Sequence, residues 1–279
     1  MKKILFLWLG FVGAVTVLSG CSKQQKPKTD WDQYDLKGKV QQLQVHYCLA
    51  YEDSTGAIVP YDMTSTDYIN FSEEGKIERI VTYDYAQEPS QTYIYDYTYH
   101  PGGLTILATL DDAFHYREEI TYTDWGEIST DKMYDADSAN YWCEFFEYDE
   151  DQRLATHFLH GRDGLMYFYD YYRYNEQGLP VYNENRDADG SIECRVYSSY
   201  DTDGRLERQQ FQYEDSTYDF EYVHTYNEQG LPEKFTRHTS NSTIEVRYLY
   251  QFDEQGNYTS KTTLTEDFAR IEERKIYYY

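Results

Sequence analysis

The sequence predicts an all-β protein, an antiparallel meander of roughly 15–16 strands built from 26-residue hairpin repeats and curled into a single sheet. Three observations lead to this prediction. One turn motif recurs at a fixed spacing, a second turn lies between its copies, and the strands alternate aromatic and polar residues.

The first turn motif recurs six times in strict register, each copy starting 26 residues after the last. Its fifth residue is glycine in every copy but one, where Gln152 stands, and glycine readily takes the positive φ that a tight turn needs. Two less regular copies, FSEEGKI from Phe71 and YHPGGL from Tyr99, precede these. The six copies are YTDWGEI from Tyr122, YDEDQRL from Tyr148, YNEQGLP from Tyr174, YDTDGRL from Tyr200, YNEQGLP from Tyr226 and FDEQGNY from Phe252.

A second turn of the same period divides each repeat into two strands. A leading strand near Val40 to Leu49 adds one more. The copies of this turn are Asp137-Ser138, Asp163-Gly164, Asp189-Gly190, Asp215-Ser216 and Asn241-Ser242.

One face of the predicted sheet is aromatic, as with Phe168 and Tyr172, and the other is mostly charged, as with Arg173 and Arg195. About sixteen strands at about 4.8 Å spacing would make a flat sheet about 75 Å wide, so the sheet must curl with its aromatic face inside. A barrel, a superhelical ribbon and a sheet folded over on itself all satisfy this. A transmembrane barrel is disfavoured, because neither face offers a lipid-facing apolar band on every strand.

The N-terminus predicts export and lipid anchoring. Lys2 and Lys3 precede an apolar run that is too short to span a membrane. Leu18-Ser19-Gly20-Cys21 resembles the bacterial lipobox, which implies cleavage before Cys21 and a lipid on its thiol. We therefore expect a signal peptide at 1–20, a lipidated cysteine and flexible linker at 21–34, and the repeat domain at 35–279. The expected location is the cell envelope, with the outer membrane as the anchoring membrane and the leaflet left open.

The segment from Asp189 through Tyr200-Asp201-Thr202-Asp203-Gly204-Arg205-Leu206 resembles the tyrosine-aspartate (YD) repeat of RHS-type proteins. The resemblance runs from about Phe71 to the C-terminus and implies short hairpins that, in large toxins, spiral into a hollow shell. This chain has a longer period, is far shorter, and lacks the arginine-rich core motif and self-cleaving end of those toxins. The chain is more similar to small YD-repeat lipoproteins of Bacteroides type. Its segment from Asp35 to Val40 resembles the opening strand of those proteins.

Charge and motifs narrow the function classes. The net charge of −25 repels nucleic acid and anionic head groups. No nucleophile elbow, phosphate loop or zinc-protease motif occurs, and the acidic turns lack the later ligands of a calcium loop. His157 and His160 point to opposite faces of a strand and cannot share a metal. We expect no cofactor, no metal and no enzyme activity.

The cysteines after Cys21 are three in number. Cys194 falls on the aromatic face and Cys143 on the other, so a bridge between them is not expected. Free thiols are predicted, and a bridge that involves Cys48 stays open.

The function that these features favour is a non-catalytic envelope lipoprotein that acts as a binding or interaction module, with carbohydrate as a candidate ligand. Aromatic residues on the polar face are the best candidate contacts, because packing does not need them there. The alternative is a scaffold that binds another protein through its acidic sheet surface or an edge strand. The candidate contacts are Tyr167, Tyr169, Tyr171 and Tyr197.

Overall fold

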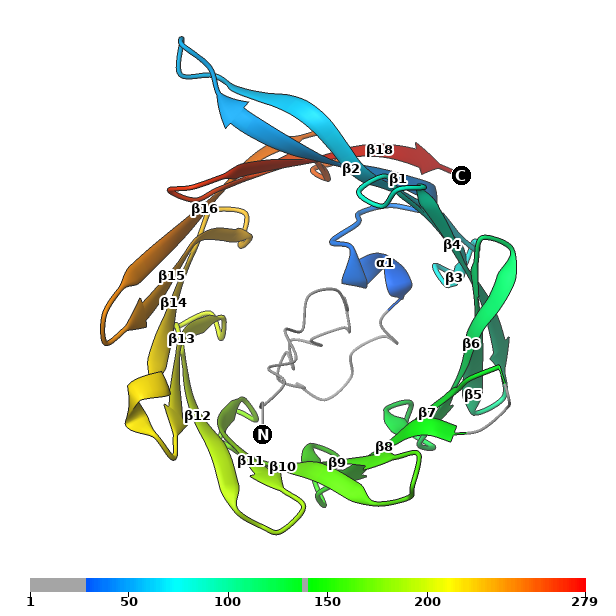
Figure 1. Cartoon of the computed structure of the whole chain (residues 1–279), viewed down its shortest axis with the longest axis vertical. Coiled ribbons are helices and arrows are strands. Elements are labelled where there is room, and N and C mark those ends of the chain that lie inside the picture. Colours follow the sequence, from blue (N-terminus) through cyan, green and yellow to red (C-terminus); the bar gives the residue numbers. More distant parts are fainter. Residues whose placement is uncertain (1–28, 137–139) are drawn as a thin grey trace.

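The computed structural model describes residues 29–136 and 140–279, in which 18 strands form one closed antiparallel barrel (Figure 1). The barrel closes because β1 (Val40–Glu52) pairs with β2 (Ile58–Phe71) on one side and with β18 (Ala269–Tyr278) on the other. The all-β meander in one curled layer is confirmed, and of the three shapes left open the sheet takes the barrel. In the part of the chain described, no helix is long and apolar enough to cross a membrane.

The remaining elements follow in chain order around the wall. They are α1 (Asp30–Gln33), β3 (Ile77–Asp84), β4 (Gln91–His100), β5 (Gly103–Leu110), β6 (Ala113–Tyr122), β7 (Ile128–Tyr134), β8 (Asn140–Tyr148), β9 (Leu154–Gly161), β10 (Met166–Tyr174), β11 (Pro180–Asp187), β12 (Ile192–Tyr200), β13 (Leu206–Tyr213), η1 (Ser216–Tyr218), β14 (Phe220–Tyr226), β15 (Pro232–Thr239), β16 (Thr243–Phe252) and β17 (Tyr258–Leu264).

The barrel has 18 strands, more than the 15–16 expected, because the turns of its first third do not follow the 26-residue period. The β5–β6 turn has no glycine. Asp111 and Asp112 take positive φ there, at 49° and 64°, which aspartate tolerates better than most residues.

Five of the six regular turns are held by an Asp or Asn at the second position of the motif, and Thr123 takes this place in the first copy, where its Oγ1 accepts from the Glu127 amide at 3.1 Å. Asn175 accepts hydrogen bonds at Oδ1 from the backbone amides of Gln177 (3.0 Å) and Leu179 (2.9 Å). Gly178 then takes φ 79°, and Gln152 takes the same kind of conformation at φ 62° in the copy without glycine. The Tyr-Asx-x-x-Gly motif is therefore a self-contained turn.

In four of the six repeats the tyrosine of the motif bonds to the start of the preceding strand. Tyr174 donates from Oη to the carbonyl of Leu154, the first residue of the preceding strand, at 2.7 Å. Burial raises the pKa of Tyr174 to about 12, so its hydroxyl remains a donor at neutral pH. The same bond recurs in three other repeats, from Tyr148 to Ile128, from Tyr200 to Pro180 and from Tyr226 to Leu206.

The aromatic face lines the lumen, as predicted. Tyr97 packs against the core cluster that includes Phe71, and the pairings Tyr97–Ile106, Ile106–Glu118 and Glu118–Met133 carry the same face around the wall. The outer face carries ion pairs between neighbouring strands. These are Arg79–Asp96 at 2.5 Å and Arg208–Glu221 at 2.8 Å, with Arg247–Glu245 at 2.6 Å along β16.

Residues 30–34, which precede β1, lie inside the barrel, which corrects the linker predicted to reach residue 34. Trp31 donates from Nε1 to the carbonyl of Val40 at 2.8 Å, and Tyr34 packs edge-on against Phe71 with ring centroids 6.0 Å apart. These two side chains are partly buried against the core cluster of the barrel wall, so residues 30–34 belong to the folded domain (Figure 1). The signal peptide, Cys21 and the rest of the linker lie outside the described residues.

Candidate functional site

Four tyrosines gather on the outer wall over three neighbouring strands and form a surface that we call the tyrosine patch. Tyr171 on β10 is 40% exposed and Tyr197 on β12 is 39% exposed. Tyr169 on β10 and Tyr182 on β11 are half-buried beside them. Three of the four predicted contacts thus lie together in this patch.

The predicted contact Tyr167 lies apart from the patch. A bulge between Met166 and Phe168 displaces it from the register of Tyr169 and Tyr171. Its ring covers Gly161, where an added Cβ would lie 2.4 Å from the Tyr167 Cε2 atom. Tyr167 is 52% exposed, but one of its faces is occupied by this glycine.

Sequence reasoning missed Tyr182, which completes the patch. It lies 13 residues after Tyr169, half of one repeat, and pairs directly with Tyr197 in the ladder. The Tyr182 and Tyr197 rings are 5.3 Å apart between centroids. The Arg173 guanidinium lies over both Tyr171 (5.5 Å) and Tyr182 (5.2 Å), which fixes the spacing of the rings.

Glu184 on β11 holds the polar groups beside the patch. Its carboxylate accepts hydrogen bonds from Tyr182 Oη (2.5 Å), Arg186 Nε (2.6 Å) and Arg195 Nε (3.2 Å). Burial alone would raise the pKa of Glu184, but these three bonds outweigh it and lower the pKa below its ordinary value. Glu184 is therefore an anion with only 8% of its surface exposed, and it orients both arginines.

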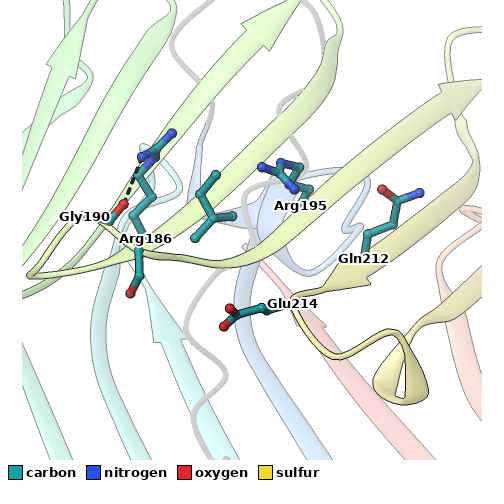
Figure 2. A pocket seen from close by; sticks show the side chains of 7 residues that line it. Arg186, Gly190, Arg195, Gln212 and Glu214 are labelled. Atoms are coloured by element: carbon teal, nitrogen blue, oxygen red, sulfur yellow. Dashed lines mark hydrogen bonds between the residues drawn. The ribbon is translucent and has the colours of Figure 1, made fainter.

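A groove of 320 Å³ opens beside Glu184 at the β11–β12 turn (Figure 2). Arg186 spans one side of it and donates from Nη1 to the carbonyl of Gly190 at 2.9 Å. Arg195 pairs in the ladder with Gln212, and Tyr197 lies two residues further along the same face of β12, so groove and patch are continuous. The lining residues are Arg186, Gly190, Ser191, Ile192, Arg195, Gln212 and Glu214.

The arrangement joins flat apolar rings to planar polar groups. Rings with an exposed face can stack on the apolar face of a flat ligand, and guanidinium, amide and carboxylate groups can hydrogen-bond to its edges. The volume of the groove lies at the lower end of the range of about 300–1,000 Å³ that small-molecule sites occupy. The site therefore suits one small ring in the groove and further rings on the tyrosines.

The lumen holds a second cluster, a row of titratable residues spaced 13 residues apart on successive strands β6 to β10. His157 lies at its centre, with Nε2 3.0 Å from Glu144 Oε2 and Nδ1 3.3 Å from Asp170 Oδ2. Its ring stacks on Phe146 at 4.8 Å between centroids. The members of the row are Glu118, Asp131, Glu144, His157 and Asp170.

Protons bound to His157 and Asp131 reduce the negative charge of this row. Burial lowers the pKa of His157, but hydrogen bonds to Asp170 and Glu144 outweigh this and raise it to about 9. Burial first, and then repulsion by Glu118, raise the pKa of Asp131 to about 8, and the pKa of Glu118 is raised by burial as well. A histidine that is already protonated is neither a general base nor a metal ligand at neutral pH.

Sequence reasoning did not find this row, although its spacing of half a repeat was visible. His157 and His160 point to opposite faces, as expected, since His157 pairs with Phe146 and His160 with Cys143. Within residues 29–136 and 140–279, no group of three or more His, Cys, Asp or Glu side chains could hold a metal ion.

The cysteines of the barrel are buried free thiols. Cys194 faces the lumen and Cys143 faces outward, because Cys194 pairs with Asn185, which contacts Asp170, whereas Cys143 pairs with Lys132. Their expected separation on opposite faces is confirmed.

Comparison with known proteins identifies the fold alone. No protein-family model matches the sequence, and no curated protein matches it. A porin-like protein from Bacteroides uniformis has a similar structure, with a TM-score of 0.50 and 12% sequence identity, over 85% of this chain and 97% of that one.

Two further structures match more weakly. A porin-like protein from Bacteroides vulgatus gives a TM-score of 0.30 at 14% identity, over 87% of this chain and 99% of that one. TcdB2-TccC3 without its hypervariable C-terminal region also gives 0.30, at 12% identity, over 79% of this chain and 15% of that one. Scores this low carry no conclusion about this chain.

Proposed function

We propose that this chain is a non-catalytic binding module of the cell envelope that holds carbohydrate on the outer wall of its barrel. The exposed rings of Tyr171 and Tyr197 beside the Arg195 groove carry this proposal. These two rings lie on the outer wall, apart from the aromatic lining of the lumen, and are 40% and 39% exposed. Rings stack on the apolar faces of sugars, and the groove supplies donors and acceptors for hydroxyl groups.

The N-terminal segment and the charged outer wall both support the proposed location. The lipobox-like Leu18-Ser19-Gly20-Cys21 supports a lipid anchor in the cell envelope, and the resemblance to YD-repeat lipoproteins agrees with it. The charged outer wall, with pairs such as Arg79–Asp96, supports a barrel that stands in water, because a charge at the bilayer midplane costs about 2–4 kcal/mol. The anchor is then the membrane contact that the proposal requires.

The lumen row supports a non-catalytic role. His157 is protonated between two carboxylates and Asp131 keeps its proton, so neither is free to accept a proton from a substrate at neutral pH.

A glycan array with the chain from Ser22 onward, which keeps every strand of the barrel, tests the proposal, with a thermal-shift measurement to show that it is folded. The double variant Tyr171→Ala/Tyr197→Ala should lose binding by about tenfold or more without a change in melting temperature. The matched control is Phe268→Ala/Tyr277→Ala, which removes two exposed aromatics, one just before β18 and one near its end, and should bind normally. Unchanged binding by the first variant would exclude the patch.

A protein scaffold is the second candidate function, and the β1–β2 ribbon favours it. β3 pairs with β2 from Ser65 onward, so residues 58–63 of β2 project beyond the wall (Figure 1). Tyr51 and Tyr61 form an exposed pair on this ribbon, 5.9 Å apart between centroids. Pro60 has no amide to donate there, which weakens strand pairing with a partner. A Tyr51→Ser/Tyr61→Ser variant that loses an envelope protein retained by the parent chain would favour this candidate.

A further inference from the structure

The outer site is too long for a single sugar. Tyr171, Tyr182 and Tyr197 lie on three successive strands, and neighbouring strands are about 4.8 Å apart, so the outermost two rings are about 10 Å apart. Arg195 lies in the same row as Tyr171, since Tyr171 pairs with Glu184 and Glu184 pairs with Arg195, and this row is about 7 Å along the strands from the row of Tyr182 and Tyr197. A ligand that touches both patch and groove must span several rings.

The charges beside the groove are balanced, and the patch adds the Arg173 guanidinium, which lies over the Tyr171 and Tyr182 rings. Arg186 and Arg195 both bond to the Glu184 carboxylate, and Glu214 lines the far side of the groove. Two guanidinium groups therefore face two carboxylates. The whole chain carries a net charge of −25, so a polyanion approaching this wall is repelled.

The polar side chains that line the groove can form hydrogen bonds with the hydroxyl groups of a sugar. The Arg195 side chain is 41% exposed and contacts Glu184 through Nε at 3.2 Å, and a guanidinium has further N–H donors. Gln212 offers a donor and an acceptor, and Glu214 offers acceptors. A neutral sugar ring presents both donors and acceptors at its edge and therefore matches this set.

From this geometry and charge we infer that the tyrosine patch and the groove bind a neutral oligosaccharide, laid across β10 to β13, in preference to an acidic glycan. This inference rests on the proposed function and names the ligand class of the same site. Tyr171 and Tyr197 are the stacking residues. Glu184 is a positioning residue, because it reaches the ligand only through Arg186 and Arg195.

The test is titration of the chain from Ser22 onward with neutral hexasaccharides of glucose, mannose and xylose, with their monosaccharides, and with oligogalacturonate as the acidic probe. A neutral hexasaccharide should bind at least about tenfold more tightly than its monosaccharide, and Tyr197→Ala should remove about that factor. The affinity should change less than about twofold between low salt and about 0.15 M salt, because screening acts on charges.

Glu214→Gln sharpens the test, since Glu214 is exposed and its replacement leaves the groove with an excess positive charge. This variant should gain measurable binding of oligogalacturonate at low salt, whereas the parent chain should bind none. The inference would be overturned if the chain bound oligogalacturonate more tightly than every neutral hexasaccharide and if Tyr197→Ala lost that binding. The proposed carbohydrate binding would then still stand. Failure of the folded chain to bind any of these glycans would overturn both.

Discussion

The side-chain amide of Asn257 is hydrogen-bonded to both backbone groups of Lys37, 220 residues earlier in the chain. Asn257 Oδ1 accepts from the Lys37 amide at 2.5 Å, and Nδ2 donates to the Lys37 carbonyl at 3.0 Å. Asn257 is 1% exposed, at the start of the last hairpin, and Lys37 precedes β1. This pair joins the first and last parts of the barrel beside the β1–β18 ladder that closes it.

Replacing Asn257 should therefore weaken closure. Asn257→Ala removes the part-buried hydrogen bonds of the Lys37 amide and carbonyl, at about 1–3 kcal/mol for each group left unsatisfied. We expect the free energy of unfolding to fall by about 2–4 kcal/mol, measured by urea unfolding followed by circular dichroism. Asn241→Ala, at an exposed turn, should change it by less than about 0.5 kcal/mol. Equal effects of the two substitutions would contradict this role.

The lumen row predicts that the barrel loses stability as pH rises. His157 and Asp131 bind a proton more tightly in the fold than in the unfolded chain, with folded pKa values of about 9 and about 8. Stability from a raised pKa is fully present below the unfolded pKa and is lost as pH rises through the folded one. As pH rises, these two groups should therefore lower the melting temperature in a thermal-shift series, Asp131 between about pH 4 and about pH 8 and His157 between about pH 6.5 and about pH 9.

Two variants separate the contributions to this pH dependence. His157→Gln should flatten the decline between about pH 6.5 and 9, and Asp131→Asn should flatten it from about pH 4 to 8, because each removes one group that titrates in that window. His238→Gln, on the exposed outer wall, is the control and should keep the parent slope. If the melting temperature of both lumen variants depended on pH as it does in the parent chain, groups other than His157 and Asp131 would be responsible for the decline.

Gly75 tests the docking of the segment before β1. An added Cβ at Gly75 would lie 2.6 Å from Trp31 Cε3, and the Gly75 carbonyl accepts from the Asp30 amide at 2.7 Å. Gly230 has the same φ of +80° with open space around it, so Gly230→Ala measures the backbone cost alone. Gly75→Ala should cost about 1–3 kcal/mol more than Gly230→Ala in urea unfolding, through overpacking against Trp31. Equal costs would mean that the Trp31 contact adds nothing to stability.

The features that could be predicted from the sequence are those that repeat locally. Asn175 and Gly178 form their turn with neighbours in the chain, so the 26-residue period predicted the hairpins and the inward aromatic face. The Asp111-Asp112 turn between β5 and β6 has no copy elsewhere in the repeat pattern, so the number of strands in this part of the chain was underestimated.

Contacts between segments that lie far apart in the chain could not be predicted from the sequence pattern. The Asn257–Lys37 pair and the burial of Trp31 depend on which strands meet when the sheet closes, and no local signal states this. Tyr182 joined the patch only once its register against Tyr197 was known. The lumen row needed the same knowledge, because residues 13 apart become neighbours only when each turn fixes the register of its strands.

Each of the four turn tyrosines that bond to the preceding strand should contribute a separate and additive increment of stability. Tyr226→Phe removes the bond from Oη to the Leu206 carbonyl (2.7 Å) while the ring keeps its stacking with the Arg205 guanidinium at 5.0 Å. The expected loss is about 1–2 kcal/mol, since the Leu206 carbonyl loses a donor. Tyr174→Phe, two repeats away, should cost a similar amount, and the double variant should lose the sum, because sites more than about 7–10 Å apart act independently. Tyr218→Phe, whose hydroxyl belongs to an exposed side chain in η1, should cost nothing measurable in the same urea series, and a comparable loss there would refute the assignment.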